Sequence, residues 1–333
     1  MKIQFSHKYK DIISLENLLA AWQEFVAGKK NKQDVQDFSR RLFDNILSLH
    51  KDLENGSYQH GGYKDFYIAD PKPRHIHKAP VRDRLLHHAI YRLLYPFFDR
   101  IFIADSFSCR NNKGTHRALK RFQKMIDHVS LNKTRTCWIL KCDIKKFFDS
   151  VDHNVLIQIL REYIPDSDIM SLLKKIIESY SSGIGSGAGL PLGNLTSQLF
   201  SNIYLNVFDQ WIKHKLKAKN YIRYCDDFVI LSFNKQALEK SEKEIQMFLA
   251  EKLKLNLHPE KTFVKTAASG MDFLGWIHFS DYRVLRRATR KRMMNRIAEH
   301  PTDETLQSYL GMLRHGNGWK LVNALLNEYW LKK

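Results

Sequence analysis

Two adjacent carboxylates lie in the middle of a stretch of β-prone residues. Asp226 and Asp227 follow Tyr224-Cys225, and apolar residues flank this tetrapeptide on both sides. Two apolar segments around a short polar turn are typical of a β-hairpin, here with both aspartates at its tip. Two like charges beside apolar strands are costly unless a cation neutralises them, and Mg²⁺ prefers carboxylate oxygens. The pattern indicates a metal site, although the tetrapeptide alone equally fits a solvated turn.

A third carboxylate ends an earlier predicted strand. The apolar run from Trp138 stops at Asp143, and a basic, aromatic turn then leads to a helix that begins near Ser150 or Asp152. If Asp143 meets the hairpin tip at one edge of a sheet, three carboxylates can hold two metal ions about 3.5–4 Å apart, the arrangement used for in-line displacement at phosphorus. We therefore expect Asp143, Asp226 and Asp227 to be catalytic metal ligands.

The two motifs, in this order, resemble those of reverse transcriptases. Asp143 matches the aspartate of motif A, and Tyr224 to Asp227 match the Tyr-X-Asp-Asp box. The resemblance implies an RNA-directed DNA polymerase with two Mg²⁺ ions, or Mn²⁺ in their place. It implies a right-hand fold of class α+β, with an antiparallel-sheet palm, mixed fingers and a helical thumb. A catalytically dead nucleic-acid-binding scaffold is the alternative, and the intact aspartates disfavour it.

The counterpart of motif B departs from the common pattern. Most reverse transcriptases have Gln-Gly-X-X-X-Ser-Pro, whereas residues 192–198 are Leu-Gly-Asn-Leu-Thr-Ser-Gln. This variant resembles the enzymes of diversity-generating retroelements, a type within the bacterial, group II intron-like reverse transcriptases that misreads template adenines. Leu192, Gly193 and Gln198 are then expected beside the incoming nucleotide. Leu192 lacks the polar contacts of a glutamine, so base-pair geometry should be less strictly controlled. Related bacterial reverse transcriptases, of phage-defence or uncharacterised type, remain the alternative.

Basic residues of the predicted fingers are candidates for binding the dNTP triphosphate. Prolines and basic residues alternate over residues 67–84, which predicts extended strands with a basic turn. By resemblance to group II intron-type enzymes, Arg74 and Arg84 should grip the triphosphate, because a guanidinium binds phosphate oxygens in a bidentate manner. Lys72 and Arg82 are lesser candidates. A solvated basic hairpin is the alternative.

Two further residues have roles that the resemblance implies. Phe148 stands five residues beyond Asp143, where an aromatic ring in the family lies under the sugar of the dNTP and excludes a 2′-hydroxyl. An ordinary core aromatic is the alternative. Lys261 lies in a segment that matches motif D and would protonate the departing pyrophosphate, or is simply a surface lysine. Met271 to Trp276 match the primer grip.

The charge of the chain indicates a polyanionic partner. Its 54 Lys and Arg against 35 Asp and Glu give a formal net charge of +19, and nucleic acid is the commonest such partner. Arg110 and Lys113, in a polar loop before a helix, are expected to contact the template backbone. In the basic tail, Arg283, Arg287 and Arg290 would share one face of a helix along the template–primer duplex. The implied partners are template RNA, the RNA–cDNA duplex, dNTPs and a small accessory protein.

The elements that position these residues divide the chain into three predicted parts. Residues 1–64 form an N-terminal helical extension, with two helices over 11–55 and a break at 28–32; residues 65–280 form fingers and palm, and 281–333 a helical thumb. Further helices are expected at 85–98, 153–163, 167–180 and 236–255. No apolar run is long enough to span a bilayer, the N-terminus lacks a secretory h-region, and the four cysteines lack zinc-like spacing. We therefore expect a cytoplasmic protein with no membrane contact.

Overall fold

The computed structural model describes residues 3–69, 73–183 and 187–333. The chain forms two compact units that interleave along the sequence. Unit 1 comprises residues 1–104, 144–215 and 247–256, and unit 2 comprises 105–143, 216–246 and 257–333. Both units combine helices with antiparallel strands, so the predicted α+β class is confirmed.

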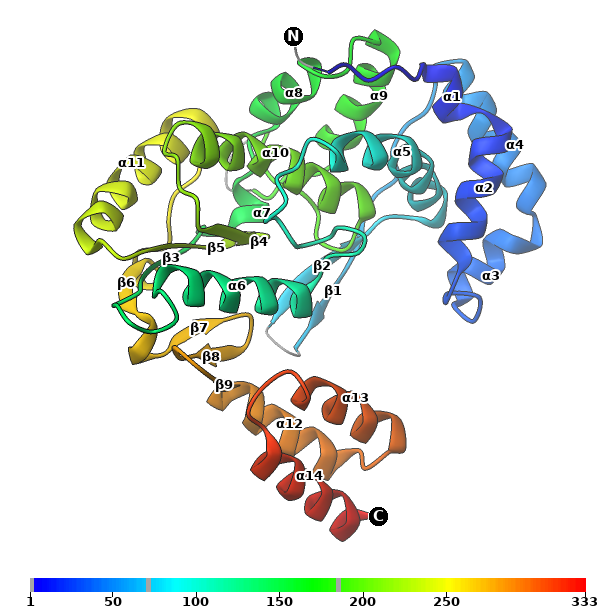
Figure 1. Ribbon diagram of the computed structural model, residues 1–333. Helices are drawn as coiled ribbons and strands as arrows, with labels where there is room; N and C mark the ends of the chain where they lie inside the picture. The colour runs from blue at the N-terminus through cyan, green and yellow to red at the C-terminus, as the bar shows by residue number, and fades with distance from the viewer. Residues whose placement is uncertain (1–2, 70–72, 184–186) are drawn as a thin grey trace. The chain divides into compact units, whose positions relative to one another are not determined.

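The main sheet of unit 2 has four antiparallel strands in the order β4-β5-β3-β6. These are β3 (Trp138–Asp143), β4 (Tyr221–Tyr224), β5 (Asp227–Ser232) and β6 (Phe263–Thr266). Helix α6 (Thr115–Val129) packs against this sheet through a shared apolar cluster that includes Phe122, Ile139 and Val229 (Figure 1). The central strand β5 is buried along its length apart from its two ends, which gives the sheet edge a rigid support.

A second sheet of unit 2 leads into the C-terminal helices. Strands β7 (Met271–Phe273), β8 (Trp276–His278) and β9 (Arg283–Leu285) form an antiparallel meander. Helices α12 (Arg287–Glu299), α13 (Asp303–Leu313) and α14 (Trp319–Lys332) pack around their own apolar cluster, drawn in orange to red in Figure 1. The prediction that Arg283 lies on a helix is wrong. Pairing of β9 with β8 holds Arg283 opposite His278, and α12 begins only after Arg286.

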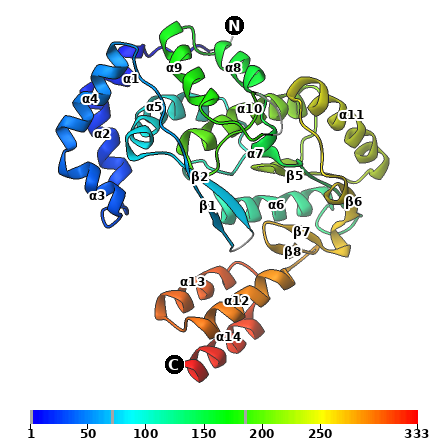
Figure 2. The same cartoon turned by 180° about the vertical axis from the view of Figure 1, so that it is seen from behind.

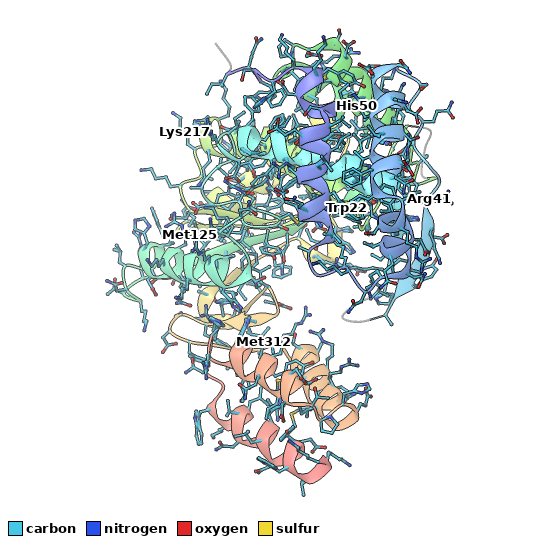
Figure 3. All side chains as sticks on the ribbon, turned by 90° about the vertical axis from the view of Figure 1, so that its right-hand side faces the viewer. Trp22, Arg41, His50, Met125, Lys217 and Met312 are labelled. Carbon is cyan, nitrogen blue, oxygen red and sulfur yellow. The ribbon has the colours of Figure 1, made fainter. Side chains whose placement is uncertain are left out.

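The N-terminal part of unit 1 contains four helices where two were predicted. They are α1 (Tyr9–Ile13), α2 (Leu15–Val26), α3 (Gln33–Arg40) and α4 (Leu42–Glu54) (Figure 2). The predicted break at 28–32 is confirmed. Ser14 accepts a hydrogen bond from the backbone N–H of Asn17 and so caps the N-terminus of α2. Arg41, which is labelled in Figure 3, separates α3 from α4 because its φ of −124° is not helical. These helix ends are set by local capping and backbone geometry, which the spacing of apolar residues does not predict.

The rest of unit 1 contains a hairpin and several helices. Strands β1 (Lys64–Ile68) and β2 (Arg74–Lys78) pair antiparallel, followed by α5 (Val81–Asp99). The other helices are α7 (Phe147–Ser150), α8 (His153–Arg161), α9 (Ser167–Glu178) and α10 (Leu195–His214); α11 (Lys235–Leu253) begins in unit 2 and ends in unit 1. The predicted helices at 85–98, 153–163, 167–180 and 236–255 are confirmed within a few residues. No helix in the described part of the chain has the length and apolar character needed to cross a bilayer.

Candidate active site

The backbone of unit 2 places the three aspartates at one edge of the main sheet. Asp143 is the last residue of β3 and Asp227 the first of β5, and the two face each other directly in the antiparallel ladder. Asp226 occupies the turn between β4 and β5 beside Cys225, whose φ of +58° allows the tight reversal. Directly opposed residues in such a ladder have Cα atoms about 4.5–5.5 Å apart. The sheet register therefore brings these carboxylates together.

The three carboxylates repel one another in this arrangement. Burial, together with the charges of Asp143 and Asp226, raises the pKa of Asp227 to about 7, although nearby Lys141 opposes the shift. Burial and the charge of Asp143 likewise raise the pKa of Asp226. Oδ1 of Asp227 is buried and has no hydrogen-bond partner. The site thus holds more negative charge than its surroundings neutralise.

Two lysines partly neutralise this charge. Nζ of Lys261 donates to Oδ1 of Asp143 at 3.0 Å. Nζ of Lys141 lies 3.5 Å from Oδ2 of Asp227 and donates to the carbonyl of Asp272 at 2.6 Å. Lys261 lies in a short 3₁₀-helix (η1, Pro259–Lys261) rather than in a strand, and Lys141 precedes Asp143 by two residues on β3. Both ammonium groups therefore contact the same carboxylates as a metal ion would.

The donor chemistry of the site fits a divalent cation. The three aspartates supply oxygen ligands only, as Mg²⁺ prefers, and the unpartnered Oδ1 of Asp227 has a vacant acceptor. With the side chains as they lie, no three His, Cys, Asp or Glu residues among those described are arranged to bind an ion. Lys261 pairs with Asp143, and Lys141 pairs with Asp227. Metal binding therefore requires the two lysine side chains to move away from these carboxylates.

The predicted triphosphate-binding arginines belong to unit 1 and differ in their surroundings. Arg74 is exposed on β2. Arg84, in contrast, pairs with Asp34 at 2.5 Å, lies over the ring of Phe25 and is only 13% exposed. Arg82 pairs with Asp52 and lies over the ring of Tyr58. Lys72 lies outside the described residues. Arg74 is therefore the more accessible cation, whereas Arg84 anchors α3 to α5.

The motif B segment is attached to β2 of the same unit. The carbonyl of Leu192 accepts the backbone N–H of His77, and Gly193 has φ +109° with Ile76 so close that a Cβ would meet its Cγ2 at 2.8 Å. Asn194 donates from Nδ2 to the carbonyl of His77 and accepts the N–H of Ala79 at Oδ1. A glycine is thus required at this close approach.

Gln198 and Phe148 occupy different helices of unit 1. Gln198 is exposed on the first turn of α10. Phe148, on α7, is half-buried, whereas its neighbour Phe147 is buried in the core. Of the two adjacent rings, Phe147 therefore has the structural role, and Phe148 retains an accessible face.

The residues predicted to contact nucleic acid belong to unit 2. Arg110 donates to the carbonyl of Ser106, and Lys113 lies over the ring of Phe107. Arg283 is partly buried, donates to the carbonyl of His315 and lies over Trp276. Arg287 and Arg290 are exposed on the first turns of α12. Arg283 therefore has structural partners, whereas Arg287 and Arg290 present their charge to solvent.

Comparison with known proteins identifies the family. Residues 69–278 match the family model described as reverse transcriptase (RNA-dependent DNA polymerase). The chain belongs to the reverse transcriptase family. Two bacterial proteins are similar to this reverse transcriptase. Protein YkfC of Escherichia coli is 27% identical over 302 residues, covering 79% of this chain and 77% of YkfC. The group II intron-encoded protein LtrA of Lactococcus lactis is 23% identical over 363 residues, covering 86% of this chain and 58% of LtrA.

A solved telomerase has a similar fold. The structure of telomerase from Candida albicans, in complex with a fragment of telomeric RNA, aligns with a TM-score of 0.52 and 14% sequence identity. The alignment covers 82% of this chain and 54% of the telomerase chain. The likeness supports a polymerase fold for this reverse transcriptase. Enzymes of this family generally use divalent metal ions, in agreement with the chemistry of the aspartate cluster.

Two site residues of this reverse transcriptase were missed by sequence reasoning. Lys141 looks like an ordinary strand lysine, and the structure shows that its ammonium group lies beside Asp227. Asn194 lies among the variable positions of motif B, and only the folded hairpin reveals its two backbone partners. The signal for Lys141 was available, because in a strand residues two apart point to the same face.

Proposed function

We propose that this chain copies an RNA template into cDNA by nucleotidyl transfer at Asp143, Asp226 and Asp227. The observation that carries the proposal is the direct pairing of Asp143 with Asp227 in the sheet, beside Asp226 at the hairpin tip. The backbone of unit 2 thereby holds three carboxylates at one sheet edge, and a cation would relieve their mutual repulsion. Membership of the reverse transcriptase family supports the same reaction.

The three aspartates would hold two Mg²⁺ ions, or Mn²⁺ in their place. Bound there, the ions would supply charge stabilisation for in-line displacement at the α-phosphorus. Lys261 now donates to Asp143; once it leaves that carboxylate, its ammonium group is a proton donor for the departing pyrophosphate. The proposed dNTP contacts, all in unit 1, are Arg74, Arg84, Phe148, Leu192, Gly193 and Gln198. The proposed nucleic-acid contacts are Arg110, Lys113, Arg283, Arg287 and Arg290.

The test is to remove one metal ligand. Asp226→Ala should reduce primer extension on an RNA template on the order of 10³-fold, because several kcal/mol of charge stabilisation are lost. RNA binding should be unchanged, since it depends on basic charge spread over the surface. Asp281→Ala is the matched control, because Asp281 is an exposed aspartate of the same unit. Normal extension by the Asp226→Ala enzyme would overturn the site.

We further propose that synthesis is error-prone at template adenines, as in diversity-generating retroelements. Support comes from Leu192, which has no side-chain hydrogen bond to offer and which is fixed to β2 by its carbonyl. The proposed setting is the cytoplasm, with template RNA, dNTPs and a small accessory protein as partners. A related bacterial reverse transcriptase with a role in phage defence is the second candidate.

Leu192→Gln tests the error-prone reading. A polar side chain adds a directional contact, and leaving it unpaired in a wrong base pair costs about 1–3 kcal/mol, which is roughly ten- to hundredfold in discrimination. We expect misincorporation to fall opposite adenine more than opposite the other three bases. The measurement is sequencing of cDNA made by both enzymes on one RNA, where the other bases serve as internal control. Equal error spectra would contradict the retroelement assignment.

A further inference from the structure

Arg223, the third residue of strand β4, is completely buried in unit 2. Arginine is almost never fully buried unless its donors have partners, because removing a charge from water is costly. Only Tyr224 and Cys225 separate this residue from Asp226 in the sequence. A buried cation this close to the catalytic carboxylates points to a role in the site.

The guanidinium of Arg223 joins the turn that carries Asp226 to a neighbouring segment. Its Nη1 donates to the carbonyl of Cys225 at 3.1 Å, and its Nη2 donates to Oγ of Ser106 at 3.1 Å. Ser106 is itself fully buried. The planar fork of a guanidinium lets one side chain bind both acceptors at once. The carbonyl of Cys225 and the hydroxyl of Ser106 are thereby held by one rigid group.

The backbone that carries this guanidinium is hydrogen-bonded on both edges. The N–H of Arg223 donates to the carbonyl of Asp105 at 3.0 Å, and the carbonyl of Arg223 accepts the N–H of Phe107 at 3.0 Å. These two bonds pair Ser106 with Arg223 in parallel, on the outer edge of β4. The other edge of β4 pairs with β5. The position of Arg223 is therefore set by the sheet and not by the turn.

The turn that Arg223 contacts could adopt two backbone forms. Tyr224 pairs with Asp227, so Cys225 and Asp226 form a two-residue hairpin turn. Such turns are usually of type I′, with positive φ at both central residues, or of type II′, with positive φ at the first alone. Here φ is +58° at Cys225 and negative at Asp226, which matches type II′. The two forms differ by rotation of the peptide group between the central residues.

The carbonyl that accepts from Arg223 belongs to this central peptide group. It is the carbonyl of Cys225, so the bond from Nη1 opposes rotation of the peptide toward type I′. A positive φ at a residue other than glycine is strained and persists only where the surrounding structure maintains it. Rotation of the peptide would change φ of Asp226 and with it the direction of the side chain. The bond from Arg223 therefore acts on the orientation of a metal ligand.

We propose that Arg223 is a positioning residue, which holds the turn in its type II′ form and so directs the carboxylate of Asp226 into the aspartate cluster. Ser106 shares this role, because it fixes the other arm of the guanidinium. The inference rests on the proposed function, in which the three aspartates bind metal ions. Residues that orient a metal ligand without touching the metal typically contribute roughly 10- to 100-fold to metal affinity or activity.

Arg223→Lys tests the proposal, because it keeps the buried charge but lacks the planar fork. Binding of Mn²⁺ to the free protein is measured by electron paramagnetic resonance, with Asp226→Ala as the background. We expect the Kd for Mn²⁺ to rise about tenfold. The Mg²⁺ concentration for half-maximal primer extension should rise by a similar factor, and extension should recover at high Mg²⁺. A partly unfolded enzyme would instead be slower at every Mg²⁺ concentration.

Ser106→Ala is a second variant, which keeps the test decisive if Arg223→Lys does not fold. It removes one acceptor and leaves the buried arginine in place. We expect a smaller loss, about threefold in both measurements, because one hydrogen bond is lost. The double variant should be no weaker than Arg223→Lys alone, since both changes break the same link. Losses that multiply would contradict a shared role.

Arg92→Lys is the matched control. Arg92 also joins separate residues, Asn17 and Glu24, but lies in unit 1. Its replacement should lower the urea midpoint and leave Mn²⁺ binding unchanged. Parental Mn²⁺ affinity in Ser106→Ala, or in an Arg223→Lys protein that circular dichroism shows to be folded, would overturn this inference and leave the proposed function intact. A parent that binds Mn²⁺ no better than Asp226→Ala would instead overturn the metal site itself.

Discussion

Single side chains set the charge balance of the aspartate cluster. Lys141 and Lys261 each contact one carboxylate, yet Asp227 retains a raised pKa and an unpartnered oxygen. An ammonium group carries a single positive charge, half that of a divalent ion. The lysines therefore neutralise part of the carboxylate charge when no metal is bound. The negative charge that remains at Asp227 still favours binding of a metal ion.

Phe148 lends itself to a direct test of sugar selection. Phe148→Val should admit ribonucleotides that the parent rejects, because a smaller side chain leaves room for a 2′-hydroxyl. The measurement is the ratio of ribonucleotide to deoxyribonucleotide incorporation, with an expected rise of about tenfold or more. Phe147→Leu is the matched control, because Phe147 is the buried ring of the pair; it should lower stability and leave the ratio unchanged. An unchanged ratio in Phe148→Val would make Phe148 a packing residue.

The positions of single residues could be predicted from sequence only where the pairing of two strands determines them. Asp143 and Asp227 meet because the antiparallel strands β3 and β5 pair at these ends. Each aspartate stands at one end of a short apolar run, which predicts the strand end and allows the two carboxylates to converge on one sheet edge. Arg84 has the same local signature as Arg74, yet it pairs with Asp34, fifty residues earlier in the chain. Long-range partners of this kind leave no mark in local spacing.

Among the larger elements, the hairpin β1–β2 and the motif B segment behave as one piece. Asn194 is buried and bonds to the backbone of both His77 and Ala79, while the carbonyl of Leu192 bonds to the N–H of His77. Three hydrogen bonds, one from Leu192 and two from Asn194, thus join the motif B segment to the end of the strand that carries Arg74. A substitution in the motif B segment should therefore alter the position of the β1–β2 hairpin, and the reverse.

Asn194→Ala should uncouple the two elements. Loss of two side-chain hydrogen bonds leaves a buried carbonyl and N–H unpaired, at a cost of about 1–3 kcal/mol each. We expect a lower unfolding temperature together with a higher KM for dNTPs. Asn45→Ala is the control, since Asn45 also bonds to backbone, at the carbonyl of Phe38; it should lower stability without changing KM. An unchanged KM in Asn194→Ala would show that the segment is held in place by packing alone.

Some boundaries of helices and strands could be predicted from local sequence, and others could not. The hairpin β4–β5 and helix α11 have strong periodicity and were predicted within two residues. The segment of strand β9 was predicted as helix, because Arg283 stands at helical spacing from Arg287 and Arg290, but pairing with β8 provides its backbone hydrogen bonds instead. Tertiary pairing outweighs intrinsic preference in so short a segment.

At the scale of the whole molecule, buried histidines should make stability depend on pH. Burial and nearby Arg283 lower the pKa of His278 to about 3, against about 6.5 in an unfolded chain. The unfolded state therefore binds a proton below pH 6.5 that the folded state excludes, and stability falls as the pH decreases. From pH 7 to pH 5 this residue should cost about 2 kcal/mol.

Comparison of urea unfolding at these two pH values measures the effect. His278→Phe should lose about 2 kcal/mol less than the parent between pH 7 and pH 5. The other histidines whose pKa burial lowers, including His87 and His88, contribute equally to both proteins. The same pH dependence in both would mean that His278 is protonated in the folded state as well.

The interleaving of the two units has a consequence during synthesis on the ribosome. Strand β3 is central in its sheet, but its partners β5 and β6 follow long insertions that belong partly to unit 1. At about 5–20 residues per second, β3 waits on the order of ten seconds for both neighbours to emerge. During that interval β3 has no neighbouring strand and its apolar side chains stay exposed, so we expect chaperones to bind the nascent chain. Slower translation should therefore lower the yield of folded enzyme rather than raise it.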